Sequence, residues 1–281
     1  LHAQKESPEG DGGTVQSMAV MAHRFMQSGR KGLEAADGRA ILDARLAVRL
    51  AVLAIAAVTV AAFAGSLQNE LVGWDDQQNL VRNTAYRGLS LAHLRWMFTT
   101  SFGGHYQPLT WLSFAVESEL LWGVNAAGFH FTNLLLHLAT AIGLFFVAIR
   151  LMKLAQPAID SPSVVIGALA AALLFAVHPL RVESVAWATE RRDVLSGAWL
   201  MAAVLLYLRA VAAADGRRRG GAFLLSLLCY VLSLLSKASG MTLPLVLLLL
   251  DVYPLQRFSL EAKRPAARTW RSVLGEKAIF A

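Results

Sequence analysis

The chain has 281 residues, of which 56% are hydrophobic and only 16% are charged. A soluble domain carries about 25% charged residues, so this composition excludes an ordinary soluble domain and is typical of an integral membrane protein. The net charge is +7, but the basic residues cluster at the ends of apolar runs and form no groove interleaved with aromatic residues. We therefore predict a membrane-lipid environment and no nucleic-acid partner. The single cysteine, Cys229, lies inside an apolar run and is expected to be a buried hydrophobe.

The sequence divides into three parts by composition. Residues 1–44 are polar and Gly-rich ("SPEGDGG", "ADGRA"), which predicts a disordered cytoplasmic tail. Residues 45–257 carry the long apolar runs and form the expected membrane domain, and residues 258–281 form a basic cytoplasmic segment. Because the chain begins with leucine, we expect it to be part of a longer protein.

Apolar runs predict about six membrane spans in an all-α polytopic helix bundle. In chain order they are Leu46–Leu67, Phe129–Met152, Val164–Val177, Val194–Val211, Ala222–Leu235 and Met241–Val252. A spanning helix needs about 17–25 apolar residues. The third, fifth and sixth runs are shorter, so we expect helices that continue into polar turns or are broken where protein shelters them.

The distribution of lysine and arginine predicts the orientation. With the N-terminus in the cytoplasm, 18 basic residues fall on the inner side and seven on the outer side. This bias is typical of an integral membrane protein with its N-terminus in the cytoplasm, and we expect the membrane to be a bacterial inner membrane. It places two loops, residues 68–128 and 178–193, together on the outer side.

The longer outer loop contains two amphipathic stretches. Residues 89–100 ("LSLAHLRWMFTT") and 108–122 ("PLTWLSFAVESELLW") predict helices that lie on the membrane surface. Trp96, Trp111 and Trp122 are the expected interface anchors.

Two polar groups in this loop are candidates for chemistry. Asp75 and Asp76 stand side by side behind Trp74, and the alternative to a site is a turn or helix start capped by aspartate. The stretch "GGHYQPLTW" places His105, which can exchange a proton near neutral pH, before an amphipathic helix. A Gly-Pro turn with incidental side chains is the alternative there.

A third polar group lies within the second apolar run. His130, Asn133 and His137 are separated by three and four residues and therefore share one helical face. Polar residues in a span face the bundle interior or a wet cavity. Hydrogen bonding between helices and a functional role both fit this pattern.

The fourth group fills the second outer loop, "HPLRVESVAWATERRDVLS". Adjacent Arg191 and Arg192 suit a phosphate, because a guanidinium offers a planar fork of donors. The alternative is a salt-bridged loop in which Glu190 and Asp193 neutralise the arginines. With carboxylates on one outer loop and arginines on the other, the residues favour a site for a phosphate-bearing lipid, in which the two loops face one outer cavity.

At these motifs the chain resembles the membrane portion of the TMTC family of transmembrane and tetratricopeptide-repeat proteins. The resemblance runs from about Leu46 to Arg257. It is carried by "GWDDQQNLVRN", "HYQPLTWLSFAVESELLWGVNAAGFHFTNLLLHLATA", "FAVHPLRVESVAWATERRDVLSG" and "SKASGMTLPLVLLLLDVYPL". Family members also carry repeats of about 34 residues, which this sequence lacks, so we expect it to be the N-terminal part of such a protein or a degenerate copy of one.

The resemblance implies a GT-C-type glycosyltransferase that passes a sugar, with mannose as the candidate, from a polyprenyl-phosphate donor to Ser or Thr of a protein acceptor. It implies that Asp75 or Asp76 is the catalytic base; we expect one to face the acceptor and the other to hold the loop, and we favour Asp76 as the base. It implies that Arg191 or Arg192 holds the donor phosphate. The supporting residues are His105, His130, Asn133, His137, His178, Glu183, Glu190 and Asp193. No residue is assigned to a metal, and dependence on a divalent metal stays open.

The alternative function is a non-catalytic membrane scaffold, anchor or carrier of the same family. In that case the polar face of the second span would line a path or hold helices together. Transporters commonly show repeated topological halves, and the sequence shows no clear duplication.

Overall fold

The computed structural model describes residues 42–257 and 270–280, and these residues contain helices and turns but no strand. The first helix forms the span Leu42–Gln68, which ends in the 3-10 turn η1 (Ala64–Gln68). The elements that follow are η2 (Gln77–Arg82), α2 (Leu91–Thr99), η3 (Phe102–Gly104), α3 (Pro108–Leu120), α4 (Ala126–Ala155), α5 (Ser161–Ala176), α6 (Arg181–Ala186), η4 (Ala188–Glu190), α7 (Arg191–Ala212), α8 (Gly216–Ser236), η5 (Ala238–Thr242), α9 (Leu243–Val252) and α10 (Trp270–Ala278).

The membrane-spanning helices match the apolar runs of the sequence. Four helices in the described part of the chain are long and apolar enough to cross a membrane, and two shorter apolar helices accompany them. The four are Leu42–Gln68, Ala126–Ala155, Ala188–Ala212 and Gly216–Ser236, and the shorter two are Ser161–Ala176 and Ala238–Val252. The prediction of an all-α membrane helix bundle is confirmed. The expected tail, residues 1–44, lies outside the described residues except for its last three, and so does most of the basic segment from residue 258.

Local sequence explains why the helices start where they do. Asn125 accepts a hydrogen bond from the Gly128 backbone at 2.9 Å, and Asp160 accepts one from Ser163 at 2.8 Å. Such caps satisfy backbone donors that have no partner within the helix. Helix α8 begins before the fifth predicted run, because Asp215 caps it and the basic residues from Arg217 form its first turn.

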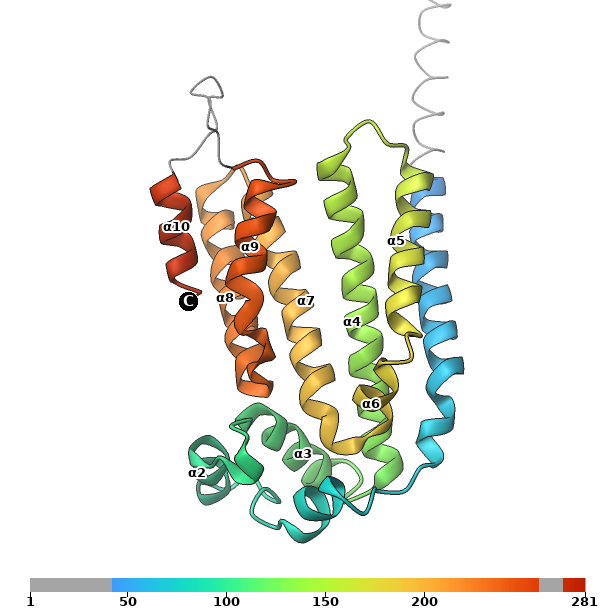
Figure 1. Cartoon of the computed structure of the whole chain (residues 1–281), viewed down its shortest axis with the longest axis vertical. Coiled ribbons are helices and arrows are strands. Elements are labelled where there is room, and N and C mark those ends of the chain that lie inside the picture. Colours follow the sequence, from blue (N-terminus) through green and yellow to red (C-terminus); the bar gives the residue numbers. More distant parts are fainter. Residues whose placement is uncertain (1–41, 258–269, 281) are drawn as a thin grey trace, which may run out of the picture. The chain divides into compact units, whose positions relative to one another are not determined.

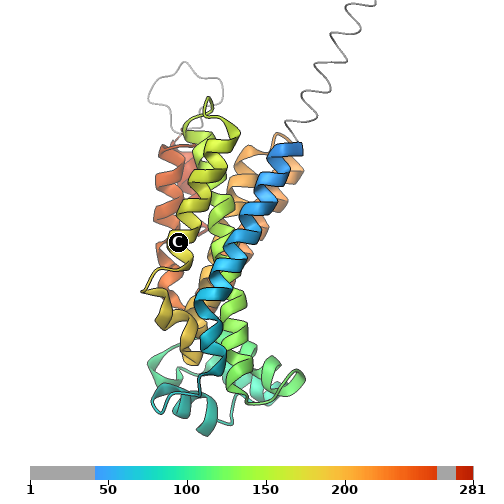
Figure 2. The same cartoon turned by 90° about the vertical axis from the view of Figure 1, so that its right-hand side faces the viewer.

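Helix α5 packs against α4, α4 against α7, and α7 against α8, so that the four helices form one bundle (Figures 1 and 2). Small and hydroxyl residues allow close approach: a methyl group on Gly143 of α4 would lie 2.7 Å from Met201 Cβ of α7. Between α7 and α8, Ser226 donates to the Ala203 carbonyl at 2.7 Å and Ser233 to the Ser196 carbonyl at 3.0 Å. Such contacts are typical of helix association in membranes.

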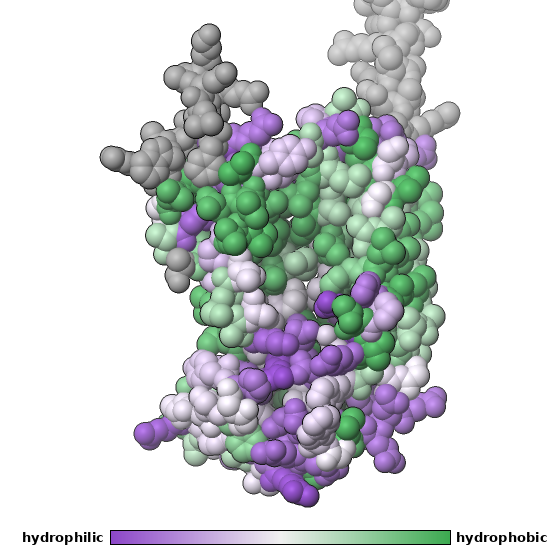
Figure 3. Space-filling model, in the orientation of Figure 1, coloured by the Kyte–Doolittle hydropathy of each residue, from purple (hydrophilic) through white to green (hydrophobic). Residues whose placement is uncertain are grey.

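The outer surface of the helices is apolar, as a lipid-facing surface must be. Large hydrophobic side chains such as Leu53, Leu174, Leu228 and Leu249 are exposed. Figure 3 shows apolar side chains gathered over the helices and polar ones gathered towards the end that carries α2 and α3. The fold therefore has a lipid-facing belt and a polar end.

That polar end is a compact arrangement of η2, α2, η3, α3, α6 and η4, which we call the loop cluster (Figure 1). Its core is aromatic: Trp111 is fully buried and stacks on Tyr86 with ring centroids 5.9 Å apart. The prediction of two helices in residues 89–122 is confirmed. The prediction that Trp111 anchors the membrane interface is wrong, because the indole is the centre of this small core rather than part of its surface.

Charged groups tie the opposite end of the bundle together. Asp251 of α9 is fully buried and accepts hydrogen bonds from Tyr207 of α7 at 2.6 Å and from Arg257 at 3.2 Å. Lys277 of α10 lies 2.7 Å from the other Asp251 oxygen. These contacts fix α10 against α7 and α9.

Candidate functional site

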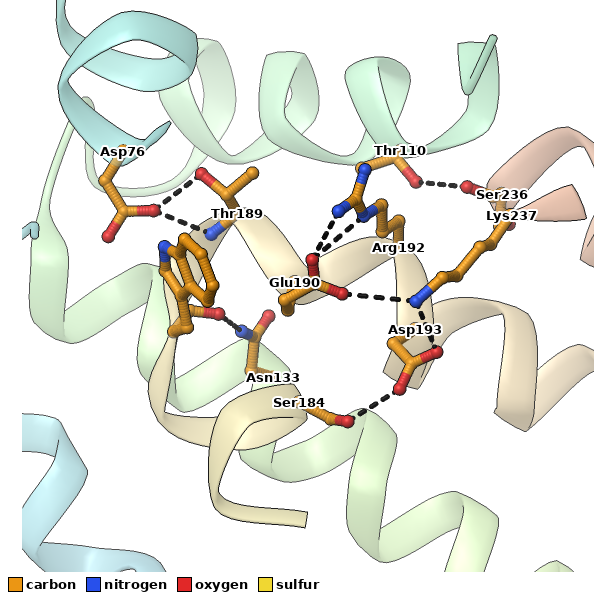
Figure 4. Close-up of polar contacts among 11 residues, drawn as sticks. Asp76, Thr110, Asn133, Ser184, Thr189, Glu190, Arg192, Asp193, Ser236 and Lys237 are labelled. Atoms are coloured by element: carbon orange, nitrogen blue, oxygen red, sulfur yellow. Dashed lines mark hydrogen bonds and ion pairs between the residues drawn. The ribbon is translucent and has the colours of Figure 1, made fainter. Parts of the chain in front are cut away.

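Asp76 connects the loop of residues 68–128 to the loop of residues 178–193. It immediately precedes η2, its side chain is fully buried, and Oδ1 accepts hydrogen bonds from Thr189 N at 2.8 Å and Thr189 Oγ1 at 2.6 Å. Oδ2 accepts a third bond from Val72 N at 3.0 Å. Both carboxylate oxygens are thus engaged, and Asp76 holds the first loop against η4 (Figure 4).

Asp75 differs from its neighbour in exposure. Its side chain is partly exposed. Trp74 before it is 76% exposed and stacks on Trp187 of the second loop with ring centroids 6.4 Å apart. One aspartate therefore holds the loop and the other remains accessible, and the contacts give the holding role to Asp76.

Arg191, the first residue of α7, is fully buried and faces inward. Its guanidinium donates to both carboxylate oxygens of Glu117 on α3, to the Asn133 side chain, and to the Phe129 carbonyl at 2.8 Å. The Arg191 Nη1 atom that bonds Glu117 also lies 3.5 Å from Ser113 Oγ. An arginine has five N–H donors, and all five are directed at protein groups here. Arg191 thus joins α3, α4 and α7 and has no donor left for a ligand.

Arg192 belongs to a second ionic network, drawn in Figure 4. Its guanidinium donates to Glu190 Oε1, and Glu190 Oε2 accepts from Lys237 Nζ at 3.2 Å. Lys237 also donates to Asp193 at 2.8 Å, and Asp193 accepts from Ser184 at 2.6 Å. The alternative prediction was a salt-bridged loop in which Glu190 and Asp193 neutralise the two arginines. The structure shows such a loop, but Glu190 pairs with Arg192 and Lys237, and Asp193 pairs with Lys237.

A cavity of about 530 Å³ opens beside this network, and we call it the basic cavity. Its lining residues are Gly104, His105, Tyr106, Gln107, Arg192, Leu234, Ser236, Lys237, Ala238, Ser239 and Met241. Arg192 donates hydrogen bonds to Glu190 through Nε and Nη2, and its Nη1 atom makes no hydrogen bond with another described residue. The cavity therefore offers a free guanidinium donor, a lysine and an exposed histidine. Neither Asp75 nor Asp76 lines it, so this cavity is not the shared one that we expected the aspartates and the arginines to face.

The polar face of α4 has mixed roles. Asn133 donates to the Trp187 carbonyl at 3.0 Å, and His137 Nε2 lies 2.9 Å from the Ala176 carbonyl. These contacts match the alternative of hydrogen bonding between helices. His130 is fully buried, and neither ring nitrogen has a hydrogen-bond partner among the described residues. A second cavity of about 240 Å³ is lined in part by His137, Arg181 and Asp193.

The remaining predicted residues lie at the surface. His178 and Glu183 are exposed, and no group of three or more possible metal ligands occurs in the described ranges. The pKa of the Tyr86 phenol is raised by burial in the aromatic core. Sequence reasoning missed Glu117, Thr189 and Lys237. Lys237 could have been found, because it is a lone cation between two apolar runs in a stretch that carries the family resemblance.

The fold and this site define an all-α integral membrane protein in which two polar loops meet at one end of the helix bundle. The chain belongs to the TMTC family. It is 31% identical over 221 residues to human "Protein O-mannosyl-transferase TMTC1", and the aligned region covers 72% of this chain and 23% of that protein. It is 26% identical over 224 residues to human "Protein O-mannosyl-transferase TMTC4", with 74% and 30% covered.

A relative from Drosophila melanogaster, "Protein O-mannosyl-transferase Tmtc1", is 34% identical over 149 residues, or 53% of this chain and 16% of that protein. The chain thus spans less than a third of the length of these relatives. No protein-family model matches it, and no solved structure does.

Proposed function

We propose that this chain is part of a membrane glycosyltransferase that transfers a sugar from a polyprenyl phosphate to a Ser or Thr hydroxyl of a protein. The observation that carries the proposal is the contact between Asp76 and Thr189, which joins the loop of the paired aspartates to the arginine loop at the polar end of the bundle. The curated relatives named as protein O-mannosyl-transferases support the same class of reaction.

In this proposal Asp75 is the catalytic base. A base must reach the substrate hydroxyl, and Asp75 is partly exposed whereas both Asp76 oxygens are engaged within the protein. Asp75 would take the proton as the hydroxyl oxygen attacks the anomeric carbon and the bond from that carbon to the phosphate oxygen breaks. Such a base contributes about 10²–10⁴-fold to the rate.

The leaving group is a polyprenyl phosphate, which gains negative charge as the bond breaks. The basic cavity supports this step, because Arg192 has a free donor and Lys237 a charged ammonium group there. Cations held in place before the reaction stabilise charge that develops in the transition state. We therefore propose Arg192 and Lys237, rather than Arg191, as the donor-phosphate residues.

The test uses the full-length protein with single variants Asp75→Asn and Asp76→Asn and follows sugar transfer to acceptor protein in membranes. We expect Asp75→Asn to lose at least about 100-fold in transfer with unchanged thermal stability. Asp76→Asn is expected to lose both transfer and stability, because an amide cannot accept from Thr189 and Val72 at once. Normal transfer by Asp75→Asn would refute the assignment of the base.

The cavity residues are tested separately. Arg192→Gln and Lys237→Gln are expected to raise the KM for the lipid donor, and Glu183→Gln, an exposed residue of the same loop, serves as the control. If all three variants behave like the parent protein, the donor phosphate binds elsewhere. If no donor supports transfer in the parent protein, the non-catalytic scaffold or carrier function is favoured.

A further inference from the structure

A cavity at the end of the bundle away from the loop cluster has no part in the proposed reaction. It has a volume of about 590 Å³ and lies where α4 and α7 end and α8 begins. Figure 1 shows these helix ends on the side opposite α2 and α3. The distribution of basic residues predicts that this side faces the cytoplasm. The lining residues are Arg150, Leu206, Arg209, Ala212, Ala213, Ala214, Asp215, Arg218, Gly221, Ala222 and Leu225.

Positive charge dominates the rim of this cavity. Arg150, Arg209 and Arg218 line it together with one acidic residue, Asp215. Asp215 is already engaged, since it accepts from Arg217 N at 3.1 Å and lies 3.7 Å from Arg218 Nε. The side chains of Arg150 and Arg209 make no ion pair or hydrogen bond with another described residue. Two exposed guanidinium groups from different helices therefore line one cavity with no counter-ion of their own in the described part of the chain, an arrangement that suits a phosphate.

The wall below the rim is apolar. Leu206 of α7 and Ala222 and Leu225 of α8 line it, and Leu225 continues onto the exposed surface of the bundle. A small hydrophilic anion would leave this surface without a partner. An anion with attached hydrocarbon chains would contact both parts, and basic pockets between membrane helices are known sites for anionic lipid headgroups.

We propose that this cavity binds the headgroup of an anionic phospholipid. The lipid phosphate lies between Arg150 and Arg209, and its acyl chains follow the apolar surface of α7 and α8. The site is separate from the basic cavity, which is lined by the outer loops and the opposite end of α8. It does not depend on the proposed glycosyltransferase reaction.

Retention of lipid by the purified chain tests the proposal. The protein is reconstituted in nanodiscs of phosphatidylcholine with phosphatidylglycerol, extracted in mild detergent and examined by native mass spectrometry. We expect one phosphatidylglycerol per chain to be retained. The double variant Arg150→Gln with Arg209→Gln should retain at least about tenfold less, because the charge-assisted hydrogen bonds are lost. Arg217→Gln, which changes a neighbouring exposed charge that does not line the cavity, should retain lipid normally.

Two adjacent glycines offer a second test that leaves every charge in place. A side-chain atom added at Gly221 or Gly220 meets nothing within 4 Å, and only Gly221 lines the cavity. We therefore expect Gly221→Leu to fill the space and lower lipid retention, and Gly220→Leu to leave it unchanged.

Three results would overturn the proposal. Equal loss in Arg217→Gln would show a general attraction of surface charge. Equal retention of phosphatidylcholine would show that the anionic headgroup is not recognised. Displacement of the lipid by millimolar inorganic phosphate, with no effect of Gly221→Leu, would indicate a site for a free anion.

Discussion

Removing the carboxylate of Glu117 is expected to be among the most destabilising single changes in this chain. Glu117 of α3 pairs with Arg191 of α7, and the two side chains are 4% and 0% exposed. In Glu117→Gln the Arg191 guanidinium stays charged, because arginine does not lose its proton in proteins. It then lies in the interior with only neutral acceptors.

The size of the effect follows from this burial. Breaking a buried ion pair by removing one partner costs about 3–5 kcal/mol, because the remaining charge is left uncompensated. The opposite change, Arg191→Met, should cost less, since a buried carboxyl group can take up a proton and become neutral. The double variant should be more stable than the sum of the single effects predicts, with a coupling of at least about 1 kcal/mol.

Reversible unfolding in mixed detergent micelles, followed by tryptophan fluorescence, measures these differences. Glu183→Gln is the matched control, because Glu183 is exposed in the neighbouring loop. The reasoning is refuted if Glu117→Gln costs less than about 1 kcal/mol, or if Arg191→Met is the more damaging single change.

Three further changes test other parts of the fold. Gly143→Ala should cost about 1–3 kcal/mol in unfolding free energy, because Met201 Cβ stands 2.7 Å from the new methyl group. Gly167→Ala should cost less, because its methyl group meets only the end of the flexible Met152 side chain. Ser233→Ala should cost about 1 kcal/mol in the same assay by removing a hydrogen bond between α7 and α8, and an unchanged midpoint would contradict this. Burial raises the pKa of the Tyr86 phenol. The stability that the neutral phenol contributes is therefore complete below about pH 10 and is lost as the pH rises through the higher pKa of the folded state. In a pH series of thermal melts, Tyr86→Phe should lack this loss.

The sequence predicted the helices well because hydrophobic periodicity and length are local properties. All six apolar runs are helical, and most predicted ends lie within a few residues of the observed ones. The exceptions have local causes: α8 starts earlier because Asp215 caps it, and the last run is divided at η5 and α9.

The site was harder to predict because a side chain's partners depend on packing between distant segments. Arg191 and Arg192 are neighbours in sequence, yet the helix turns them about 100° apart. One meets Glu117, 74 residues away, and the other meets Glu190. Asp75 and Asp76 divide in the same way. From the sequence we predicted a split for the two aspartates but favoured Asp76, the buried one, as the base, and we predicted no split for the two arginines.

The loop cluster is joined to the helices at two separate points, and this limits how a ligand can enter. Glu117 of α3 is bonded to Arg191 of α7, and Thr110 of α3 donates to the Ser236 carbonyl of α8 at 3.1 Å. Lifting the cluster away from the bundle would break a buried ion pair and several hydrogen bonds at once. For the lipid-linked donor that we propose, entry sideways from the bilayer between helices would leave these contacts intact.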